Sequence, residues 1–576
     1  MASKASGKAK NDKKSKKTNQ PAKTELFERL NGFFENNANV LFYVLLILHA
    51  LFAFLLFDFK VSIGGDDSSY ISMAYRLIYE GNFPSYKGPL YPMFLSILIA
   101  IFGIKLTLLK SFSFLFILVH FYFLFKAFQK RVPAFILAFT MIIVALNAYL
   151  LYFASQTYTE AFYLMLQAIF FYYFFVHFID KEPAGSIKKD YPVFIFLGLI
   201  LFLLGLTKNI GYTAFIAVMF YFLIRLRWKN MGYTLLSFSI FYGLMRLVKS
   251  VFFDYSGSQL RSQLAGLMLK DFYDASQGQE DFAGMVQRFF ENMNQYISHH
   301  FYKFFGFRDQ YADDISILTI LTVVLFIAGI YYAIKKRNEY QLFSGIYIGI
   351  LAGIMFIILQ VSWDQGRLII IFFPILFLLL LYALYHLSFE KRFVWLKIPL
   401  LLLMIVIFFT NLNVLTERVQ ENKTALAKGL KGDKFQGYTP DWVNYLKMSQ
   451  YAADQAPKDV MIASRKNNMS FIYGKRKFYR IGRVPTNDPD ELLDQLRNAN
   501  VQYVIMASLR RNPLRKTQYT INTVKRYLYY IQRKYPYVLE LVHKIGTDEP
   551  AFLYRIHYEN VVHVNPDYEP IEEKGN

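Results

Sequence analysis

The sequence predicts a polytopic α-helical membrane protein that ends in a soluble α/β domain. Three observations support this fold class. Apolar residues make up 55% of the 576-residue chain, twelve apolar runs occur up to residue 412, and alternating strand-like and helix-like patterns follow them. A helix needs roughly 20 apolar residues to cross a hydrocarbon core about 30 Å thick, whereas helices buried in soluble proteins keep a polar face.

The twelve apolar runs are the candidate crossings. They occupy residues 40–57, 89–104, 107–126, 132–152, 157–179, 191–207, 210–226, 232–253, 313–334, 341–361, 367–387 and 395–412. The first run follows a long lysine-rich segment and has no A-x-A exit, so it is predicted to be an uncleaved anchor. The second run is the weakest candidate, because it is short and begins with Pro89 and Pro92.

Basic residues explain the net charge of +22 and orient the chain. Lysines are concentrated in residues 1–35, which have few apolar residues and are predicted to form a disordered cytoplasmic tail. Short basic loops mark the cytoplasmic side of a membrane protein, which argues against nucleic-acid binding as the reason for the charge. If 89–104 is a re-entrant or juxtamembrane helix, the loops at 126–131 and 335–337 both fall inside.

This topology predicts about eleven crossings in an integral plasma (inner) membrane protein. The N-terminus is then cytoplasmic, and residues 36–412 form the membrane domain. Its large outer loops are 58–88 and 254–312, and the second carries an amphipathic segment at 282–301 that we expect to lie at the membrane interface.

Residues 413–576 are predicted to form an extracytoplasmic α/β domain. Its expected strands are 459–464, 501–508, 538–545 and 551–558. One of its helices is expected to begin with Asp488 as N-cap and Pro489 at the first helical position. The absence of cysteine excludes disulfides and thiolate metal sites.

Polar side chains gather on the predicted outer face, at the ends of apolar runs. They are Asp66, Asp67, Lys87, Glu160, Lys208 and Arg367. Polar groups that converge at the mouths of membrane helices indicate a functional site. Carboxylates opposite cations suit a transfer in which a base takes a proton while cations hold an anionic leaving group such as phosphate.

Each of these residues also has a purely structural interpretation. Asp66 or Asp67 would complement the dipole of a helix that begins there, and Glu160 would do so for the next. Lys87 and Arg367 would anchor helix ends at the headgroups. The spacing of His299 and His300 alone does not indicate a metal site, since adjacent residues on a helix point about 100° apart.

Taken in order, these motifs resemble the GT-C superfamily of membrane glycosyltransferases that use polyprenyl-phosphate sugars. The similarity is to the branch of protein O-mannosyltransferases and lipid A aminoarabinose transferases. Its most specific residues are Asp66-Asp67-Ser68-Ser69-Tyr70 and Lys87-Gly88-Pro89-Leu90. The resemblance covers residues 40–412 and, more loosely, the C-terminal domain.

The resemblance implies roles for individual residues. Asp66 would be the catalytic carboxylate, with Asp67 and Glu160 as further acids of the site. Tyr70, Lys87, Lys208 and Arg367 would bind substrate, with Lys87 on the lipid phosphate. The family usually has two prolines after this lysine, where Gly88 replaces the first, and aminoarabinose transferases carry a metal-binding glutamate where Tyr86 stands.

The resemblance implies that a sugar is transferred, with inversion, from a polyprenyl-phosphate donor to a lipid, glycan or protein acceptor. The prenyl tail of the donor would lie in a groove formed by the re-entrant segment and its neighbours. No nucleotide-binding motif such as GxxxxGK[ST] or GxGxxG is present, which agrees with a lipid-linked donor. No metal ligands are assigned, no cofactor is certain, and a divalent metal is left open. The alternative is a transporter or flippase of lipid-linked or anionic sugars, which would place polar groups on broken helices at the midplane.

Overall fold

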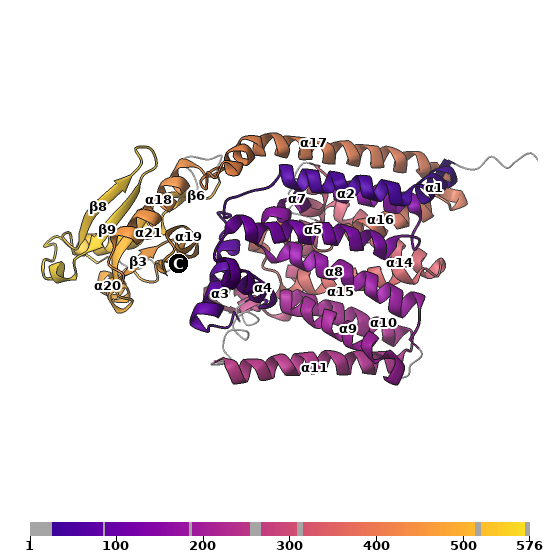
Figure 1. Ribbon diagram of the computed structural model, residues 1–576, viewed down its shortest axis with the longest axis horizontal. Helices are drawn as coiled ribbons and strands as arrows, with labels where there is room; N and C mark the ends of the chain where they lie inside the picture. The colour runs from indigo at the N-terminus through magenta and orange to yellow at the C-terminus, as the bar shows by residue number, and fades with distance from the viewer. Residues whose placement is uncertain are drawn as a thin grey trace, which may run out of the picture.

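The computed structural model describes residues 26–84, 87–183, 187–253, 266–272, 274–307, 315–512 and 520–570. A bundle of long apolar helices forms one part and a smaller domain with a sheet lies at one end of it (Figure 1). This is the architecture of a multi-pass membrane protein with a C-terminal α/β domain, as the sequence predicts.

The long helices of the bundle run side by side in roughly the same direction (Figure 1). Its first half contains α1 (Leu26–Asn36), α2 (Ala38–Leu55), α3 (Asp66–Glu80), α4 (Leu90–Phe102), α5 (Leu106–Phe128), α6 (Ala134–Ala145), α7 (Ala148–Tyr152) and α8 (Thr159–Phe174). Its second half contains α9 (Ile187–Thr207), α10 (Tyr212–Ile224), α11 (Trp228–Phe252), α13 (Phe282–Asn294), α14 (Ile317–Lys335), α15 (Glu339–Ile358), α16 (Phe373–Leu387) and α17 (Lys397–Leu430).

Among the described residues, eight helices are long and apolar enough to cross a membrane, or nine if the bent pair α6 and α7 forms one span. The pair bends by 47° where Asn147 caps α7 and donates its amide to the carbonyl of Phe304. α4, α10 and α16 are shorter apolar helices. The number of crossings therefore stays a prediction.

Hydrogen bonds show that α4 begins and ends at the same end of the bundle. Gln129, just after α5, donates to Asn39 at the start of α2. Asn31 of α1 accepts a hydrogen bond from the backbone of Phe135 at the start of α6. Since α5 returns to the end from which α2 started, no crossing is left for α4, as expected for a re-entrant or juxtamembrane helix. Its 13 residues span only about 20 Å.

The segment before α2 is not wholly disordered, contrary to the sequence-based prediction. Residues 26–36 form α1, and residues 1–25 lie outside the described part of the chain. Phe27 is fully buried and packs on Phe135 and Tyr385, with ring centroids 5.5 and 6.0 Å apart. The few apolar residues of this segment share one face, which is enough to bind it to the bundle.

Two other expected boundaries also differ. The apolar run at 367–387 becomes helical only at Phe373, because residues 366–373 form successive tight turns. The expected domain boundary at residue 412 falls inside α17, which continues to Leu430. The change in composition at 412 marks the end of the apolar part of α17 and not the end of the helix.

The C-terminal domain is a five-stranded sheet with helices packed against it. Its strands are β3 (Met461–Ser464), β4 (Phe478–Arg480), β5 (Val501–Ala507), β8 (Leu539–Ile545) and β9 (Ala551–Ile556), and its helices are α18 (Pro440–Gln455), α19 (Asn467–Gly474), α20 (Pro489–Asn498) and α21 (Thr523–Lys534). The strand order is β4-β3-β5-β9-β8, in which β3 is parallel to β4 and β5 and β9 is antiparallel to β5 and β8. The four expected strands are confirmed, and Asp488 caps α20 as predicted.

Smaller elements complete the chain. Two short hairpins are formed by β1 (Leu269–Asp271) with β2 (Asp274–Gln279) and by β6 (Leu509–Arg510) with β7 (Thr520–Ile521). The amphipathic segment at 282–301 is α13 followed by a π-helical turn, and Phe289 packs on Phe356 of α15 while Phe282 is 81% exposed.

The C-terminal domain contacts the end of the bundle that carries α3 (Figure 1). α19 packs against α3, Lys466 donates to the carbonyl of Ile63, and Tyr438 donates to that of Val61. α1 lies at the opposite end of the bundle, so the length of the bundle separates the two ends of the described chain. This arrangement agrees with an odd number of crossings.

Candidate active site

Asp66 and Asp67 occupy the first turn of α3, at the end of the bundle that faces the C-terminal domain. Gly65 precedes them with φ at +88°, a conformation that glycine adopts without a steric penalty. Two carboxylates in the first turn complement the positive end of the helix dipole, so the structure agrees with the structural role expected for the acidic pair. The two side chains nevertheless have different surroundings.

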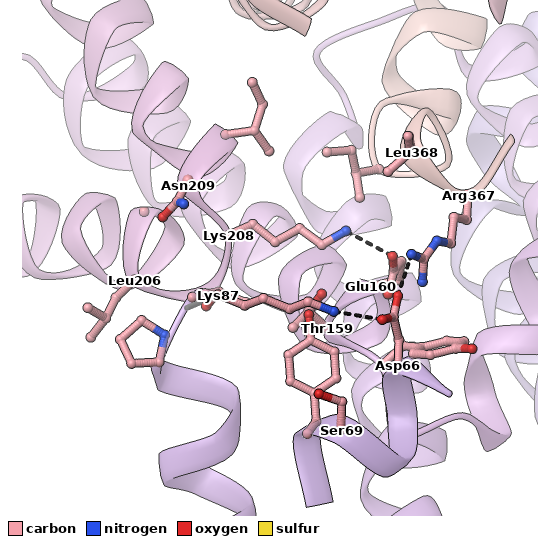
Figure 2. A pocket seen from close by; sticks show the side chains of 18 of the residues that line it. Asp66, Ser69, Lys87, Thr159, Glu160, Leu206, Lys208, Asn209, Arg367 and Leu368 are labelled. Carbon is pink, nitrogen blue, oxygen red and sulfur yellow. Dashed lines mark hydrogen bonds and ion pairs between the residues drawn. The ribbon is translucent and has the colours of Figure 1, made fainter. Parts of the chain in front are cut away.

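Asp66 is held between two cations. Its Oδ1 lies 2.6 Å from Lys87 Nζ and its Oδ2 lies 2.5 Å from Arg367 Nη2 (Figure 2). Burial alone would raise the pKa of this carboxyl, but Lys87 and Arg367 outweigh it and the pKa is lowered to about 2. Asp66 is therefore ionised at neutral pH and lines a large cavity.

Asp67 is fully buried and does not line that cavity. Its carboxylate accepts hydrogen bonds from the backbone N–H groups of Ser62, at 2.6 Å, and Ser68, at 2.7 Å. Burial raises the pKa of Asp67 to about 6, although Lys110 and the two backbone donors oppose the shift. These contacts fold the 58–67 loop, which indicates a positioning role for Asp67, and Asp66 is the acid of the pair that lines the cavity.

Lys110 is a buried residue of this site that sequence reasoning missed. It belongs to α5, is fully buried, and donates to the carbonyl oxygens of Asp58, at 2.6 Å, and Lys60. Its charge also faces Asp67. The available signal was a lysine inside an apolar run, since an ionisable group there is costly unless it has partners.

Replacing Lys110 by methionine is expected to destabilise the protein. The change leaves two loop carbonyls without their donor and removes the cation near Asp67, and each buried group left unpaired costs about 1–3 kcal/mol. We expect the melting temperature to fall by several degrees. Lys105→Met, at the exposed start of the same helix, is the control. Equal melting temperatures for the two variants would contradict the assigned role.

Glu160 and Lys208 form a second ion pair beside the first. Lys208 Nζ lies 2.9 Å from Glu160 Oε1, and the carboxylate is almost fully buried at the start of α8 (Figure 2). Lys208 lies in the break between α9 and α10. The segment carrying Lys87 approaches this break so closely that a Cβ on Gly88 would lie 2.0 Å from the carbonyl oxygen of Thr207.

The glycine that departs from the family motif therefore has a physical reason here. At position 88 only a residue without a side chain allows the backbone to reach Thr207, and this contact brings Lys87 and Lys208 to the same cavity. Both lysines point toward the acids (Figure 2).

Arg367 connects the two ion pairs. It lies on the turn between α15 and α16, contacts Asp66 directly, and is attracted electrostatically to Glu160. Burial lowers its pKa, but these two carboxylates outweigh burial and the net shift is upward. Its guanidinium also lies over the ring of Tyr158, 5.3 Å from the ring centroid.

Tyr70 forms part of the cavity wall next to Lys87. The Lys87 ammonium lies 5.1 Å from the centroid of the Tyr70 ring, and the edge of that ring packs on Tyr91. Tyr70 thus helps to orient Lys87 toward Asp66 at the cavity wall.

The cavity has a volume of about 2960 Å³ and two chemically distinct parts. One part holds the charged residues described above and continues to the C-terminal domain. The other part is a groove between the bundle helices α9, α10, α11 and α15, lined by Phe202, Leu206, Ile216, Met245, Leu247, Ile354 and Ile358. Two cations of α11, Arg246 and Lys249, also line the cavity. From the 89–104 segment only Pro89 lines it, so that segment borders the groove and does not form it.

Three side chains of types that ligate metals lie close together beside the site. One ligand atom each from His299, His300 and Asp364 lies within 4.8 Å of the others, and His300 Nε2 is 2.7 Å from Asp364 Oδ1. The two adjacent histidines lie in a π-helical turn, and their ring centroids are 4.5 Å apart. The set is of the kind that binds Zn²⁺, and it would hold the turn that carries Arg367. Tyr86 lies outside the described residues.

Solved structures provide the comparison that decides the fold. ArnT from Cupriavidus metallidurans in the apo state superposes with a TM-score of 0.50 and 12% identity, over 91% of this chain and 99% of ArnT. The chain has the GT-C fold. Weaker likenesses are ArnT bound to undecaprenyl phosphate, with a TM-score of 0.44, 12% identity and the same coverage, and oligosaccharyltransferase AglB from Archaeoglobus fulgidus in complex with an inhibitory peptide and a dolichol-phosphate.

The AglB likeness has a TM-score of 0.48 and 11% identity over 82% of this chain and 70% of AglB. No protein-family model matches the sequence, and no curated protein does. The GT-C fold accounts for the helical bundle and for the C-terminal domain at its end. The chemistry of this chain has to be argued from its own residues.

Proposed function

We propose that the protein transfers a sugar from a polyprenyl-phosphate donor to an acceptor at the outer face of the membrane. The observation that supports this best is the cavity itself. One end carries Lys87, Lys208 and Arg367, and the other is a mostly apolar groove between membrane helices. A phosphate joined to a long isoprenoid chain matches both parts. The GT-C fold agrees with the proposal.

In the proposed reaction, an acceptor hydroxyl attacks the anomeric carbon of the donor sugar. A bond forms between the acceptor oxygen and that carbon, and the bond from the carbon to the phosphate oxygen breaks. The electron pair leaves with the polyprenyl phosphate, whose negative charge Lys87 and Arg367 stabilise. The acceptor proton passes to Asp66. Attack opposite the leaving group inverts the configuration.

Asp66 is a weak base while both cations hold it, since its pKa is lowered to about 2. The donor phosphate would compete for the same two cations, Lys87 and Arg367. As they turn to the phosphate, the pKa of Asp66 rises and its carboxylate becomes a better proton acceptor. Donor binding would therefore activate the base. Glu160 would keep Lys208 and Arg367 in the cavity meanwhile.

The transporter alternative receives less support from the positions of the charges. Asp66 begins α3, which lies at the end of the bundle next to the C-terminal domain (Figure 1), and Lys87 and Arg367 contact Asp66 there. Surface glycolipids and glycans, compared by mass spectrometry between cells with the gene, without it, and with Asp66→Asn, test the function. We expect one glycan species to disappear in the last two. Identical profiles in all three would overturn the proposal.

Reporter fusions test the proposed orientation. Because the loop at 126–131 lies at the α1 end of the bundle and α17 leaves at the other, a fusion after residue 130 should report the cytoplasm and one after residue 430 the outside. The basic residues of the first loop supply the direction. A cytoplasmic signal at 430 would contradict this topology.

A further inference from the structure

Four cations of the C-terminal domain line the cavity and take no part in the site described above. They are Arg465, Lys466, Arg480 and Arg511, here called the tail cations. Arg480 ends β4, and Arg465 and Lys466 directly follow β3. Since β3 and β4 are parallel with Ser464 opposite Arg480, their carboxyl ends meet at the same edge of the sheet. Ligands often bind at this edge of parallel strands.

The tail cations repel one another. Burial lowers the pKa of Arg465, and the charges of Arg480 and Arg511 add to the effect. Burial also lowers the pKa of Lys466 to about 8, with Arg465 and Arg480 contributing and the attraction of Asp66 and Asp67 opposing the shift. Within the described part of the chain none of the four forms an ion pair with a carboxylate. Such a cluster carries an unfavourable electrostatic energy that a bound anion would remove.

The three cations near Asp66 differ in this respect. Lys87, Lys208 and Arg367 are each already paired with Asp66 or Glu160. An anion that binds there has to displace a carboxylate, whereas an anion at the tail cations displaces none. The tail cations therefore form a cationic region of the cavity distinct from the one that Asp66 and Glu160 compensate, and Arg246 and Lys249 of α11 add further positive charge to the lining.

The tail cations are also joined to the loop that carries the proposed catalytic acid. Lys466 Nζ lies 3.1 Å from the carbonyl oxygen of Ile63 and 3.4 Å from that of Gly64, two and three residues before Asp66. A ligand held by the tail cations would thus lie on the C-terminal-domain side of Asp66. The groove for the donor chain lies on the other side, among the bundle helices.

We propose that the tail cations bind a phosphate group on a carbohydrate acceptor. The inference rests on the proposed function, because only a transferase has an acceptor. Several converging cations, three of them arginines, suit the doubly charged phosphate monoester, which accepts paired hydrogen bonds from guanidinium groups. The phosphate belongs either to a lipid-anchored glycan or to a free one. Both sources present the same group to Arg465 and Arg480.

Binding measurements on the full-length protein in detergent test this proposal. The variant is Arg465→Gln/Arg480→Gln, and the control is Lys544→Gln/Arg555→Gln, which removes the same charge from exposed positions on β8 and β9. The probes are glucose 6-phosphate, glucose, a short-chain soluble phosphatidic acid and poly-glutamate. Melting temperatures of both variants confirm that each is folded.

We expect the wild type and the control to bind a phosphate probe, and the Arg465→Gln/Arg480→Gln variant to bind it at least tenfold more weakly. Preference for glucose 6-phosphate indicates a free glycan, and preference for phosphatidic acid a lipid-anchored one. Equal binding of glucose, preference for poly-glutamate, or equal phosphate affinity in variant and control would each overturn the proposal.

A second titration separates the acceptor from the donor. Saturating glucose 6-phosphate should leave the affinity for a short polyprenyl phosphate unchanged, and so should the Arg465→Gln/Arg480→Gln substitution. Competition between the two ligands would assign the tail cations to the donor site and overturn the inference. Because no turnover is measured, these results do not depend on whether Asp66→Asn abolishes transfer.

Discussion

Replacing Asp66 by asparagine is expected to abolish detectable sugar transfer, with kcat lowered by about 10²–10⁴-fold, the usual contribution of a general base. Asparagine has nearly the same size and suits the first turn of a helix, so the protein should fold and insert normally. The measurement is the rate of transfer by purified protein, together with its melting temperature. Asp454→Asn, on the exposed surface of α18, is the control.

Donor affinity distinguishes catalysis from simple binding in this variant. Without the carboxylate, Lys87 and Arg367 lose the partner that competes with the donor phosphate. Donor affinity should therefore stay the same or increase while kcat falls. A variant that keeps near-normal kcat would remove Asp66 from the chemistry. Asp67→Asn should instead act mainly on stability, because the oxygens of Asp67 accept two backbone hydrogen bonds of the 58–67 loop.

Replacing Arg367 by glutamine is expected to lower kcat/KM by about 10²–10³-fold, as when one preorganised donor to a developing anion is lost. It should also change the pH profile. Two cations hold the pKa of Asp66 at about 2, so removing one raises that pKa, and protonation of Asp66 begins at a higher pH. The acid limb of kcat/KM, which reports the free enzyme, should move upward in this variant.

Arg367→Lys is the matched control for this change. Lysine retains the positive charge but not the planar fork, so the acid limb should return toward its original position while the rate recovers only in part. Full recovery of the rate by lysine would mean that charge alone matters at this position. If the acid limb of kcat/KM does not shift in Arg367→Gln, the protonation of Asp66 does not determine the position of that limb.

The sequence predicted the features that depend on local pattern. Apolar runs predicted the helical bundle, and the strand patterns together with Asp488 predicted much of the C-terminal domain. Residues at the mouths of apolar helices were predicted to share one face, and the structure brings Asp66, Lys87 and Arg367 into contact. Their catalytic roles stay predictions. The three-residue strand β4 was missed because so short a segment has no measurable alternation.

Other features could not be predicted because they depend on contacts between distant segments. No local pattern connects Lys466 with Gly64, which are 402 residues apart in sequence. The separation of Asp66 from Asp67 depends on how the 58–67 loop folds around Lys110. Likewise, the reason for Gly88 is the carbonyl of Thr207, which approaches it only in the folded bundle.

The long helix α17 sets the distance of the C-terminal domain from the bundle and its rotation about the helix axis. Its 34 residues extend about 50 Å, more than the hydrocarbon core requires, and Asn422 marks the exit by donating to the carbonyls of Leu55 and Phe57 at the end of α2. One extra residue beyond Asn422 would turn the domain by about 100°. Seven would nearly restore its direction but raise it by about 10 Å. The chain therefore tolerates no change of length there without moving Lys466 away from the Asp66 loop.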